Sequence, residues 1–165
     1  MVDQLVIRAA VIDDAEKLGV AHVVAADEAY GHYFPAEFMK RNTVERRSEM
    51  WRKTLSASEG TPRVVVAESG REILGFGAFG PARDAEPPTR HELWRLYVLS
   101  AAYGSGLATR MLHALDPDRT PSYLWVMEAN HRAIGFYSKH GYQPDGAVEH
   151  LKLIGNLPKI RMVRH

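Results

Sequence analysis

A glycine-rich turn in the second half of the chain joins a strand to a helix, and the order of elements around it constrains the fold most. Residues 92–99 form a β-prone run, Tyr103-Gly104-Ser105-Gly106-Leu107 makes the turn, and a helix is expected over 106–115. The nearly all-apolar run 123–127 then predicts a buried strand. Together these segments predict a β-α-β crossover.

The segments before the crossover predict two helices and a hairpin. A short apolar strand at 5–9 precedes a helix that Asp13 or Asp14 caps and Gly31 ends. Asn42, with Glu45 three residues later, resembles a capping box for a second helix through Trp51 and Leu55. Two β-prone runs, 63–68 and 72–79, flank a glycine turn and predict an antiparallel pair.

The segments after the crossover complete a mixed α/β sheet. A helix is expected over 130–140 and ends at Gly141, a short strand starts at Tyr142, and 160–164 makes a last strand. Residues 80–90, which hold three prolines, predict a surface loop.

Composition limits the class of protein. The 165 residues, 45% hydrophobic and 25% charged, predict a single domain over 1–165. A net charge of +1 gives no field that would draw the chain to nucleic acid or an anionic membrane. Without cysteines there are no disulfides, thiolate metal sites or cysteine nucleophiles. Because the sequence has no signal-peptide pattern and no apolar run of membrane-spanning length, we expect a cytoplasmic protein with no membrane partner.

The glycine turn has two readings by itself. Glycines at a helix N-terminus let backbone N–H groups converge on a phosphate, but they also make an ordinary tight turn. The turn has neither the spacing of a Walker loop nor a full dinucleotide fingerprint, so ATP and NAD are poor candidates.

The helix over 130–140 adds a second signal. Asn130, Ala133 and Tyr137 lie at i, i+3 and i+7 and share one helical face. A small residue between an amide and a phenol predicts a groove for an extended ligand, whereas the alternatives are a helix cap at Asn130 and a packed aromatic at Tyr137.

These segments resemble a known family. Glu92-Leu93-Trp94-Arg95-Leu96-Tyr97-Val98, the glycine turn, and the Asn-Ala-Phe-Tyr helix that ends in Gly141-Tyr142 are similar to the GNAT superfamily of acetyl-CoA-dependent N-acetyltransferases, over about residues 60–147. The resemblance implies one α/β (α+β) domain. Its twisted, mostly antiparallel sheet has six to seven strands, splays into a V between 92–99 and 123–129, and is flanked by about four helices.

The resemblance also implies where acetyl-CoA binds. Pantetheine would lie between the two splayed strands, held by Asn130, and the pyrophosphate would rest on backbone amides from Gly104 to Ala108. The family usually carries glutamine or arginine three positions before the first glycine of the turn, where this chain has Ala101, and Arg110 is a candidate to compensate. The implied cofactor-binding residues are Leu96, Tyr97, Val98, Tyr103, Gly104, Ser105, Gly106, Leu107, Ala108, Thr109, Asn130, Ala133 and Tyr137.

Catalytic roles follow from the same resemblance. Tyr137 matches the acid that protonates the leaving thiolate, and Glu92 matches a position that carries the base in several GNAT enzymes, acting directly or through water. Glu92 could equally be a solvated carboxylate at the strand end. The backbone N–H groups of Leu96 and Tyr97 are expected to polarise the thioester carbonyl.

The sequence constrains the acceptor less than it constrains the cofactor. In this fold the acceptor pocket is commonly built from segments that correspond to 27–42, 80–91 and 146–158. Carboxylates and aromatics in the first segment could receive a cationic amine, with Asp27, Tyr30, Tyr33 and Phe34 as the candidates, and with core aromatics and solvated carboxylates as the alternative.

Three function classes therefore stay open. The chain could acetylate a small amine, acetylate a protein lysine or N-terminus, or bind acyl-CoA without catalysis. No histidine pair has metal-ligand spacing, so no metal is expected. Exposed apolar residues in the last strand, namely Ile160, Met162 and Val163, could make a homodimer contact.

Overall fold

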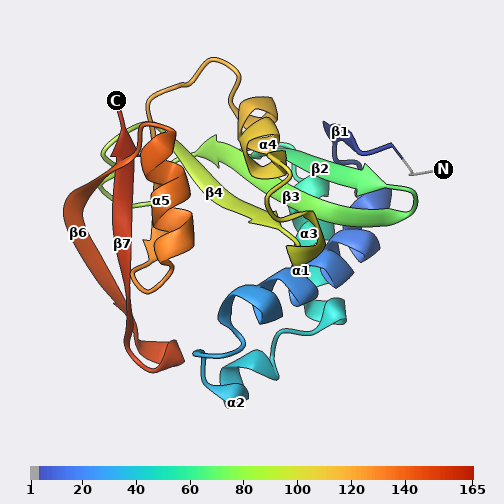
Figure 1. Ribbon diagram of the computed structural model, residues 1–165, viewed down its shortest axis with the longest axis horizontal. Helices are drawn as coiled ribbons and strands as arrows, with labels where there is room; N and C mark the ends of the chain where they lie inside the picture. The colour runs from blue at the N-terminus through green and yellow to red at the C-terminus, as the bar shows by residue number, and fades with distance from the viewer. Residues whose placement is uncertain (1–3) are drawn as a thin grey trace.

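A seven-stranded mixed sheet forms the centre of the computed structural model, which describes residues 4–165 (Figure 1). The strand order is β1-β2-β3-β4-β5-β7-β6. The strands are β1 (Val6–Ala9), β2 (Arg63–Ser69), β3 (Glu72–Pro81), β4 (His91–Val98), β5 (Ser122–Met127), β6 (Gln143–Leu151) and β7 (Leu157–Arg164). The helices are α1 (Ala15–Tyr30), α2 (Ala36–Met39), α3 (Val44–Ser56), α4 (Leu107–Leu115) and α5 (His131–Lys139), with short 3₁₀ turns at Ile12–Asp14, Ser100–Ala102 and Lys152–Ile154.

The sheet is antiparallel except where β4 meets β5. These two strands are parallel, as a crossover through α4 requires, and they pair at only two positions, His91 with Ser122 and Glu92 with Tyr123. Beyond Glu92 the strands separate. The V-splayed, mostly antiparallel sheet expected from the sequence is confirmed.

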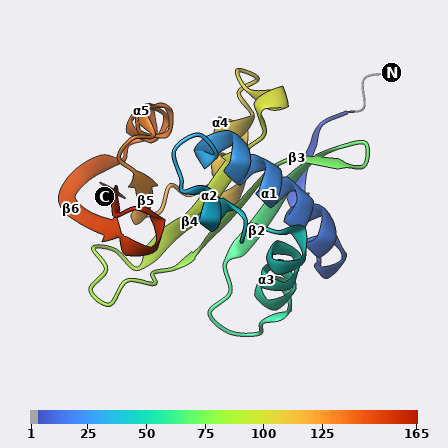
Figure 2. The ribbon, with the colours of Figure 1, turned by 90° about the horizontal axis from the view of Figure 1, so that it is seen from below.

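Two layers of helices cover the two faces of the sheet (Figure 2). On one face, Leu18 of α1 and Trp51 of α3 are buried against Phe76 of β3. On the other face, α4 and α5 enclose a second core, which includes Met111 and Tyr137. None of the helices within residues 4–165 is long and apolar enough to cross a membrane.

The cap of α3 differs from the prediction. Thr43, in an extended conformation, is the N-cap, and its hydroxyl accepts a hydrogen bond from the Arg46 N–H at 3.3 Å. Asn42 instead accepts a hydrogen bond from Arg47 Nε at 2.6 Å. The expected capping box is therefore wrong by one position, because both residues are good caps and only the backbone decides between them.

The last strand is internal to the sheet. β7 inserts between β5 and β6, and both neighbours pair with it antiparallel. Met162 and Val163 are consequently buried, with 0% and 4% exposure, and Ile160 packs against the core. The expected exposure of Met162 and Val163 is therefore wrong, because these apolar residues of β7 face the chain's own core, and a homodimer stays a prediction.

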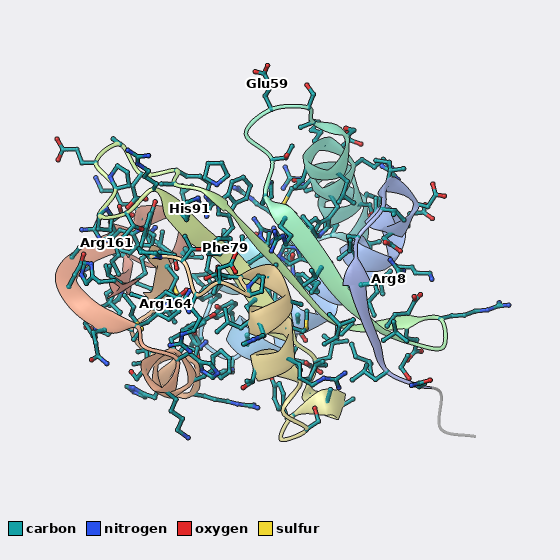
Figure 3. The ribbon with its side chains drawn as sticks, turned by 90° about the horizontal axis from the view of Figure 1, so that it is seen from above. Arg8, Glu59, Phe79, His91, Arg161 and Arg164 are labelled. Atoms are coloured by element: carbon teal, nitrogen blue, oxygen red, sulfur yellow. The ribbon has the colours of Figure 1, made fainter. Side chains whose placement is uncertain are left out.

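Arginines anchor both ends of the sheet. Figure 3 shows Arg8 on the β1 side and Arg161 and Arg164 on the β7 side. Arg8 donates to Asp14 at 2.7 Å and to Glu68 at 2.9 Å, and the hydrogen bonds from Arg8 hold the pKa of the Asp14 carboxyl below its usual value. The Arg164 side chain forms a buried ion pair with Asp116, which follows α4 directly.

Close contact between α4 and β3 depends on glycine. A Cβ at Gly77 would lie 2.6 Å from Leu115 Cδ1 and 3.1 Å from the Arg95 carbonyl oxygen, so no larger residue fits without displacement. This approach sets the position of α4, and hence of the turn at its N-terminus, relative to the sheet.

We expect Gly77→Val to lower the free energy of unfolding by about 2 kcal/mol, because overpacking forces α4 away from β3. Urea denaturation measures the change. Gly135→Ala is the matched control, since Gly135 lies in a helix with nothing within 4 Å of the added Cβ. It should leave stability unchanged or raise it by up to about 1 kcal/mol. Equal stability of the Gly77 variant and the wild type would contradict the packing argument.

Candidate active site

A cavity of about 540 Å³ opens where β4 and β5 separate. Its wall combines the end of α1, the outer half of β4, the turn before α4, the start of α4, part of β5 and one face of α5. The lining residues are Glu28, Ala29, Tyr30, Trp94, Arg95, Leu96, Tyr97, Val98, Ala102, Tyr103, Gly104, Gly106, Leu107, Ala108, Thr109, Trp125, Val126, Asn130, Arg132, Ala133, Phe136 and Tyr137.

The cavity brings together most of the residues that the sequence singled out. Every residue expected to bind the cofactor lies on the wall except Ser105. The Ser105 hydroxyl instead donates to the Ala102 carbonyl at 2.6 Å and accepts from the Leu107 N–H at 3.3 Å, which stabilises the turn from within. Of the residues expected to bind the acceptor, Tyr30 lies on the wall.

A β-bulge at Trp94, in the middle of β4, changes the face of the sheet on which the following side chains lie. Ala78 pairs with Arg95 but Phe79 pairs with Leu93, so Trp94 is an extra residue. Leu93 packs on the α4 side of the sheet, whereas Tyr97 packs on the α1 side. The bulge therefore carries Arg95 to the α1 side, where its side chain contacts Met50 and Trp51 of α3.

The backbone of β4 presents unpaired donors to the cavity. The Leu99 N–H donates to the Leu74 carbonyl at 2.8 Å, which makes Leu99 and Leu74 a hydrogen-bonded pair. By the alternation of an antiparallel ladder, Tyr97 also bonds toward β3, while the N–H groups of Leu96 and Val98 point the other way. Because β5 has separated there, these two groups have no strand partner. Leu96 and Val98, not Leu96 and Tyr97, are thus the available donors.

The turn before α4 presents a second set of donors. Gly104 and Gly106 have φ of 76° and 78°, a left-handed conformation that glycine adopts without strain. Within the described chain, the backbone N–H groups of Gly104, Gly106, Ala108 and Thr109 make no hydrogen bond. These groups converge at the positive end of the α4 dipole, an arrangement that suits an anion such as phosphate.

Helix α5 supplies the polar side chains opposite β4. Asn130 is the N-cap of this helix, and its Oδ1 accepts a hydrogen bond from the Ala133 N–H at 3.1 Å. Asn130 also lies on the cavity wall, so it is both a helix cap and a cavity residue. Tyr137 is buried, its hydroxyl makes no hydrogen bond to a described residue, and burial raises its pKa. The phenol therefore stays protonated at neutral pH and can donate its proton into the cavity.

Arg132 is a wall residue that the sequence did not single out. Its guanidinium lies 3.4 Å from the centroid of the Tyr103 ring, beside the glycine turn. Arg110, the residue proposed to compensate for Ala101, is exposed and does not line the cavity. The place of Arg132, two positions after the Asn130 cap, offered a signal, but only the fold shows that the start of α5 faces the turn.

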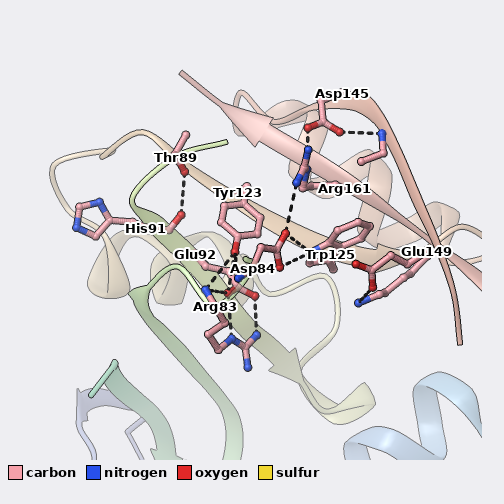
Figure 4. Close-up of polar contacts among 12 residues, drawn as sticks. Arg83, Asp84, Thr89, His91, Glu92, Tyr123, Trp125, Asp145, Glu149 and Arg161 are labelled. Carbon is pink, nitrogen blue, oxygen red and sulfur yellow. Dashed lines mark hydrogen bonds and ion pairs between the residues drawn. The ribbon is translucent and has the colours of Figure 1, made fainter. Parts of the chain in front are cut away.

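Glu92 lies in an ion-pair network at the point where β4 and β5 part (Figure 4). It is 2% exposed and does not line the cavity. Its carboxylate accepts from the Arg83 guanidinium at 2.6 and 3.0 Å, from the Arg83 N–H at 3.1 Å and from the Tyr123 hydroxyl at 3.2 Å. The network ties the loop after β3 to both strands at the apex of the V.

The same loop is held by a second set of contacts. Trp125 Nε1 donates to Asp84 at 3.1 Å, and Arg161 of β7 pairs with both Asp84 and Asp145 (Figure 4). Residues 80–91, expected to border the acceptor pocket, are thus fixed against β5 and β7.

The acceptor candidates in 27–42 separate into two groups. Glu28 lines the cavity and accepts from the Ser100 N–H at 2.8 Å and hydroxyl at 2.6 Å, and Tyr30 stacks on Phe34 with ring centroids 4.6 Å apart. Asp27 is exposed, and Tyr33 and Phe34 lie outside the wall. In residues 4–165, no cluster of three or more His, Asp or Glu side chains could hold a metal ion.

Residues 23–142 match the acetyltransferase (GNAT) family. The chain belongs to this family. It is 36% identical over 93 residues to the Probable N-acetyltransferase Rv2775 of Mycobacterium tuberculosis, and the match covers 55% of this chain and 52%, about half, of that relative.

Solved structures share the fold. The PaiA N-acetyltransferase of Thermoplasma acidophilum, in complex with coenzyme A, superposes with a TM-score of 0.73 at 17% identity, over 96% of this chain and 98% of that one. An acetyltransferase of Thermus thermophilus gives 0.69 at 20% identity, over 99% of each chain. The protein PH1933 of Pyrococcus horikoshii gives 0.70 at 20% identity, over 98% of each.

We expect Glu92→Gln to lower the free energy of unfolding by about 1–3 kcal/mol, because a buried charge-assisted network loses its acceptor charge. Urea denaturation measures this, alongside turnover at saturating substrate. Glu86→Gln, an exposed position in the same loop, should change neither quantity. If Glu92 is instead the general base, turnover will fall while stability stays at the wild-type value.

Proposed function

We propose that the chain transfers an acetyl group from acetyl-CoA to a primary amine by direct attack. One observation carries the proposal. Two sets of unpaired backbone donors, on β4 and at the start of α4, line the same cavity as the buried, unpaired hydroxyl of Tyr137. A thioester such as acetyl-CoA requires three kinds of group. These are amides that bind its pyrophosphate, a strand whose N–H groups bind its carbonyl, and a proton donor.

Binding is divided along the cavity. The amides of Gly104, Gly106, Ala108 and Thr109 are suited to the pyrophosphate, and Arg132 adds a positive charge where Ala101 supplies none. Asn130 uses its oxygen for the helix cap and keeps its amide N–H₂ for pantetheine. The small side chain of Ala133 leaves room for the chain of the ligand between Asn130 and Tyr137.

Acetyl-CoA supplies the activated acyl group, and residues of the chain assist each bond change. The N–H groups of Leu96 and Val98 stabilise the negative charge that develops on the carbonyl oxygen as the C–N bond forms. Tyr137 donates its proton to the thiolate as the C–S bond breaks, and the proton that the nitrogen loses as the amide forms restores the phenol. The products are an N-acetyl amide and CoA.

The amine must lose a proton before it attacks, because its ordinary pKa is about 10. Among the described residues on the cavity wall, Glu28 supplies the one carboxylate. We assign it the role of proton acceptor, directly or through water, in place of Glu92, which is buried and does not line the cavity.

We expect Tyr137→Phe to lower turnover by about 10²-fold with little change in acetyl-CoA affinity, since only the proton donor is lost. CoA release measures turnover, and calorimetry measures affinity. Stability should not fall, because the hydroxyl bonds to no described residue. Wild-type turnover in this variant would remove Tyr137 from the mechanism.

We expect Arg132→Ala to raise the dissociation constant of acetyl-CoA by about 10-fold, the value of one charge-assisted contact, with turnover at saturation unchanged. Arg110→Ala is the matched control and should bind as the wild type does, because Arg110 is exposed and off the wall. The reverse ranking of the two variants would assign the phosphate contact to Arg110.

An assay of CoA release against small amines, a lysine peptide and a peptide with a free N-terminus tests the function as a whole. Turnover with small amines supports the proposal. Turnover confined to peptides would indicate a protein acetyltransferase, and acetyl-CoA binding without turnover would indicate a non-catalytic module. Cytoplasmic location remains a prediction.

A further inference from the structure

Two arginines on the α1 side of the sheet have no carboxylate partner among the described residues. Arg95 lines the cavity, and its contacts are Met50 Sδ at 3.6 Å and the Trp51 ring at 5.4 Å. Arg47 of α3 donates to the Asn42 amide oxygen and forms no ion pair within residues 4–165. Both side chains are partly buried.

No ion pair with a described residue neutralises the charges of these two arginines. Burial lowers the pKa of Arg95 to about 10, the nearby charges of Arg83 and Arg47 add to the lowering, and Tyr97 and Glu92 oppose it. Burial, followed by the charges of Arg47 and Arg95, lowers the pKa of His22 to about 2, so this imidazole is neutral. Arg83 is the one member of the group with a counter-ion, and that counter-ion is Glu92.

An unpaired cation held out of water is unfavourable, and folding usually supplies a carboxylate to offset it. Here the chain supplies Trp51 and Met50 instead. The bulge at Trp94 turns Arg95 to the α1 side of the sheet, and Arg95 is part of the cavity wall.

The wall carries charges of both signs on this side. Glu28 lies near the end of α1, and Arg95 projects from β4. Arg132, the other cation on the wall, belongs to α5 and is stacked on Tyr103 beside the glycine turn. An acceptor that complements this side has an amine for Glu28 and an acidic group for Arg95.

We propose that the acceptor is an amine that also carries an acidic group, as an amino acid does, and that Arg95 binds this group. The inference rests on the proposed acetyl transfer and names its substrate class. It extends the cationic acceptor expected from the sequence, since Glu28 on the cavity wall receives the amine and Arg95 adds a contact to an acidic group. A guanidinium fork matches a carboxylate or phosphonate in a bidentate geometry.

Matched acceptors test the proposal with the full chain. L-phenylalanine is compared with L-phenylalaninamide and 2-phenylethylamine, and glycine with glycinamide, by CoA release. We expect kcat/KM to be at least about 10-fold higher for the acidic member of each set, the effect of a charge-assisted pair. Arg95→Gln should lower kcat/KM for the acidic member by about 10²-fold. Within each set, the acidic and neutral members should then have nearly equal kcat/KM.

Control variants separate binding from folding. Arg46→Gln, next to Arg47 on α3 but exposed, should keep the wild-type ratio. Arg95→Lys keeps the charge but not the fork, and should recover part of the preference. A structural role for Arg95 would lower kcat/KM equally for acidic and neutral amines, which would overturn the proposal, as would a wild-type preference for the neutral member.

Product binding provides a readout without turnover. In the presence of CoA, N-acetyl-L-phenylalanine should raise the melting temperature of the wild type more than N-acetyl-2-phenylethylamine does, and Arg95→Gln should abolish the difference. If acetyl-CoA binds and neutral amines turn over without any acidic preference, the substrate class is wrong and the proposed function holds. If acetyl-CoA does not bind, or no amine is acetylated, the proposed function fails and the substrate class with it.

Discussion

The separation of β4 from β5 is the constraint on which the rest of the site depends. A parallel pair normally satisfies the facing edges of its two strands along their length, and here it does so at only two positions. The charged network of Glu92, Arg83 and Tyr123 lies at this junction and holds the strands together where they still meet. Beyond it, β4 keeps unpaired backbone donors that a buried strand would ordinarily satisfy, and a ligand with carbonyl groups can take the place of the missing strand.

The second requirement is that α4 lies directly on the sheet. Gly77 permits the close approach, and the Arg164–Asp116 ion pair holds the end of the helix to β7. The N-terminus of α4 is thereby fixed against the open edge of β4. Its free amides and the free amides of β4 lie in one cavity because two packing contacts outside the cavity wall position the helix.

Much of this arrangement could be predicted from local sequence. The glycine turn and the i, i+3, i+7 spacing of Asn130, Ala133 and Tyr137 encode geometry within one turn or one helix, and the structure places Gly104, Gly106 and these three residues on the cavity wall. The strand order could not be read in this way. In the sequence, Met162 and Val163 resemble exposed apolar residues of an edge strand. They are core residues because β7 inserts between β5 and β6.

The surroundings of the charged residues could be predicted less well from the sequence, because their partners lie far away in the chain. Glu92 has the position of a base, but the loop that carries Arg83 folds back onto it. Arg95 lies two residues from Leu93, and strict alternation would place both on the α4 face. The bulge at Trp94 breaks that alternation, and no single residue in 92–98 indicates a bulge.

The bulge also separates the role of the β4 backbone from the role of the β4 side chains. The strand uses its backbone, at Leu96 and Val98, toward the gap with β5, and its side chains, at Arg95 and Tyr97, toward α1 and α3. In the proposed function, thioester recognition therefore rests on backbone N–H groups, which every residue type except proline possesses, whereas acceptor recognition rests on side chains that substitution can change. A chain built in this way can alter its acceptor by changing the α1-facing side chains of one strand while the backbone that holds the thioester stays the same.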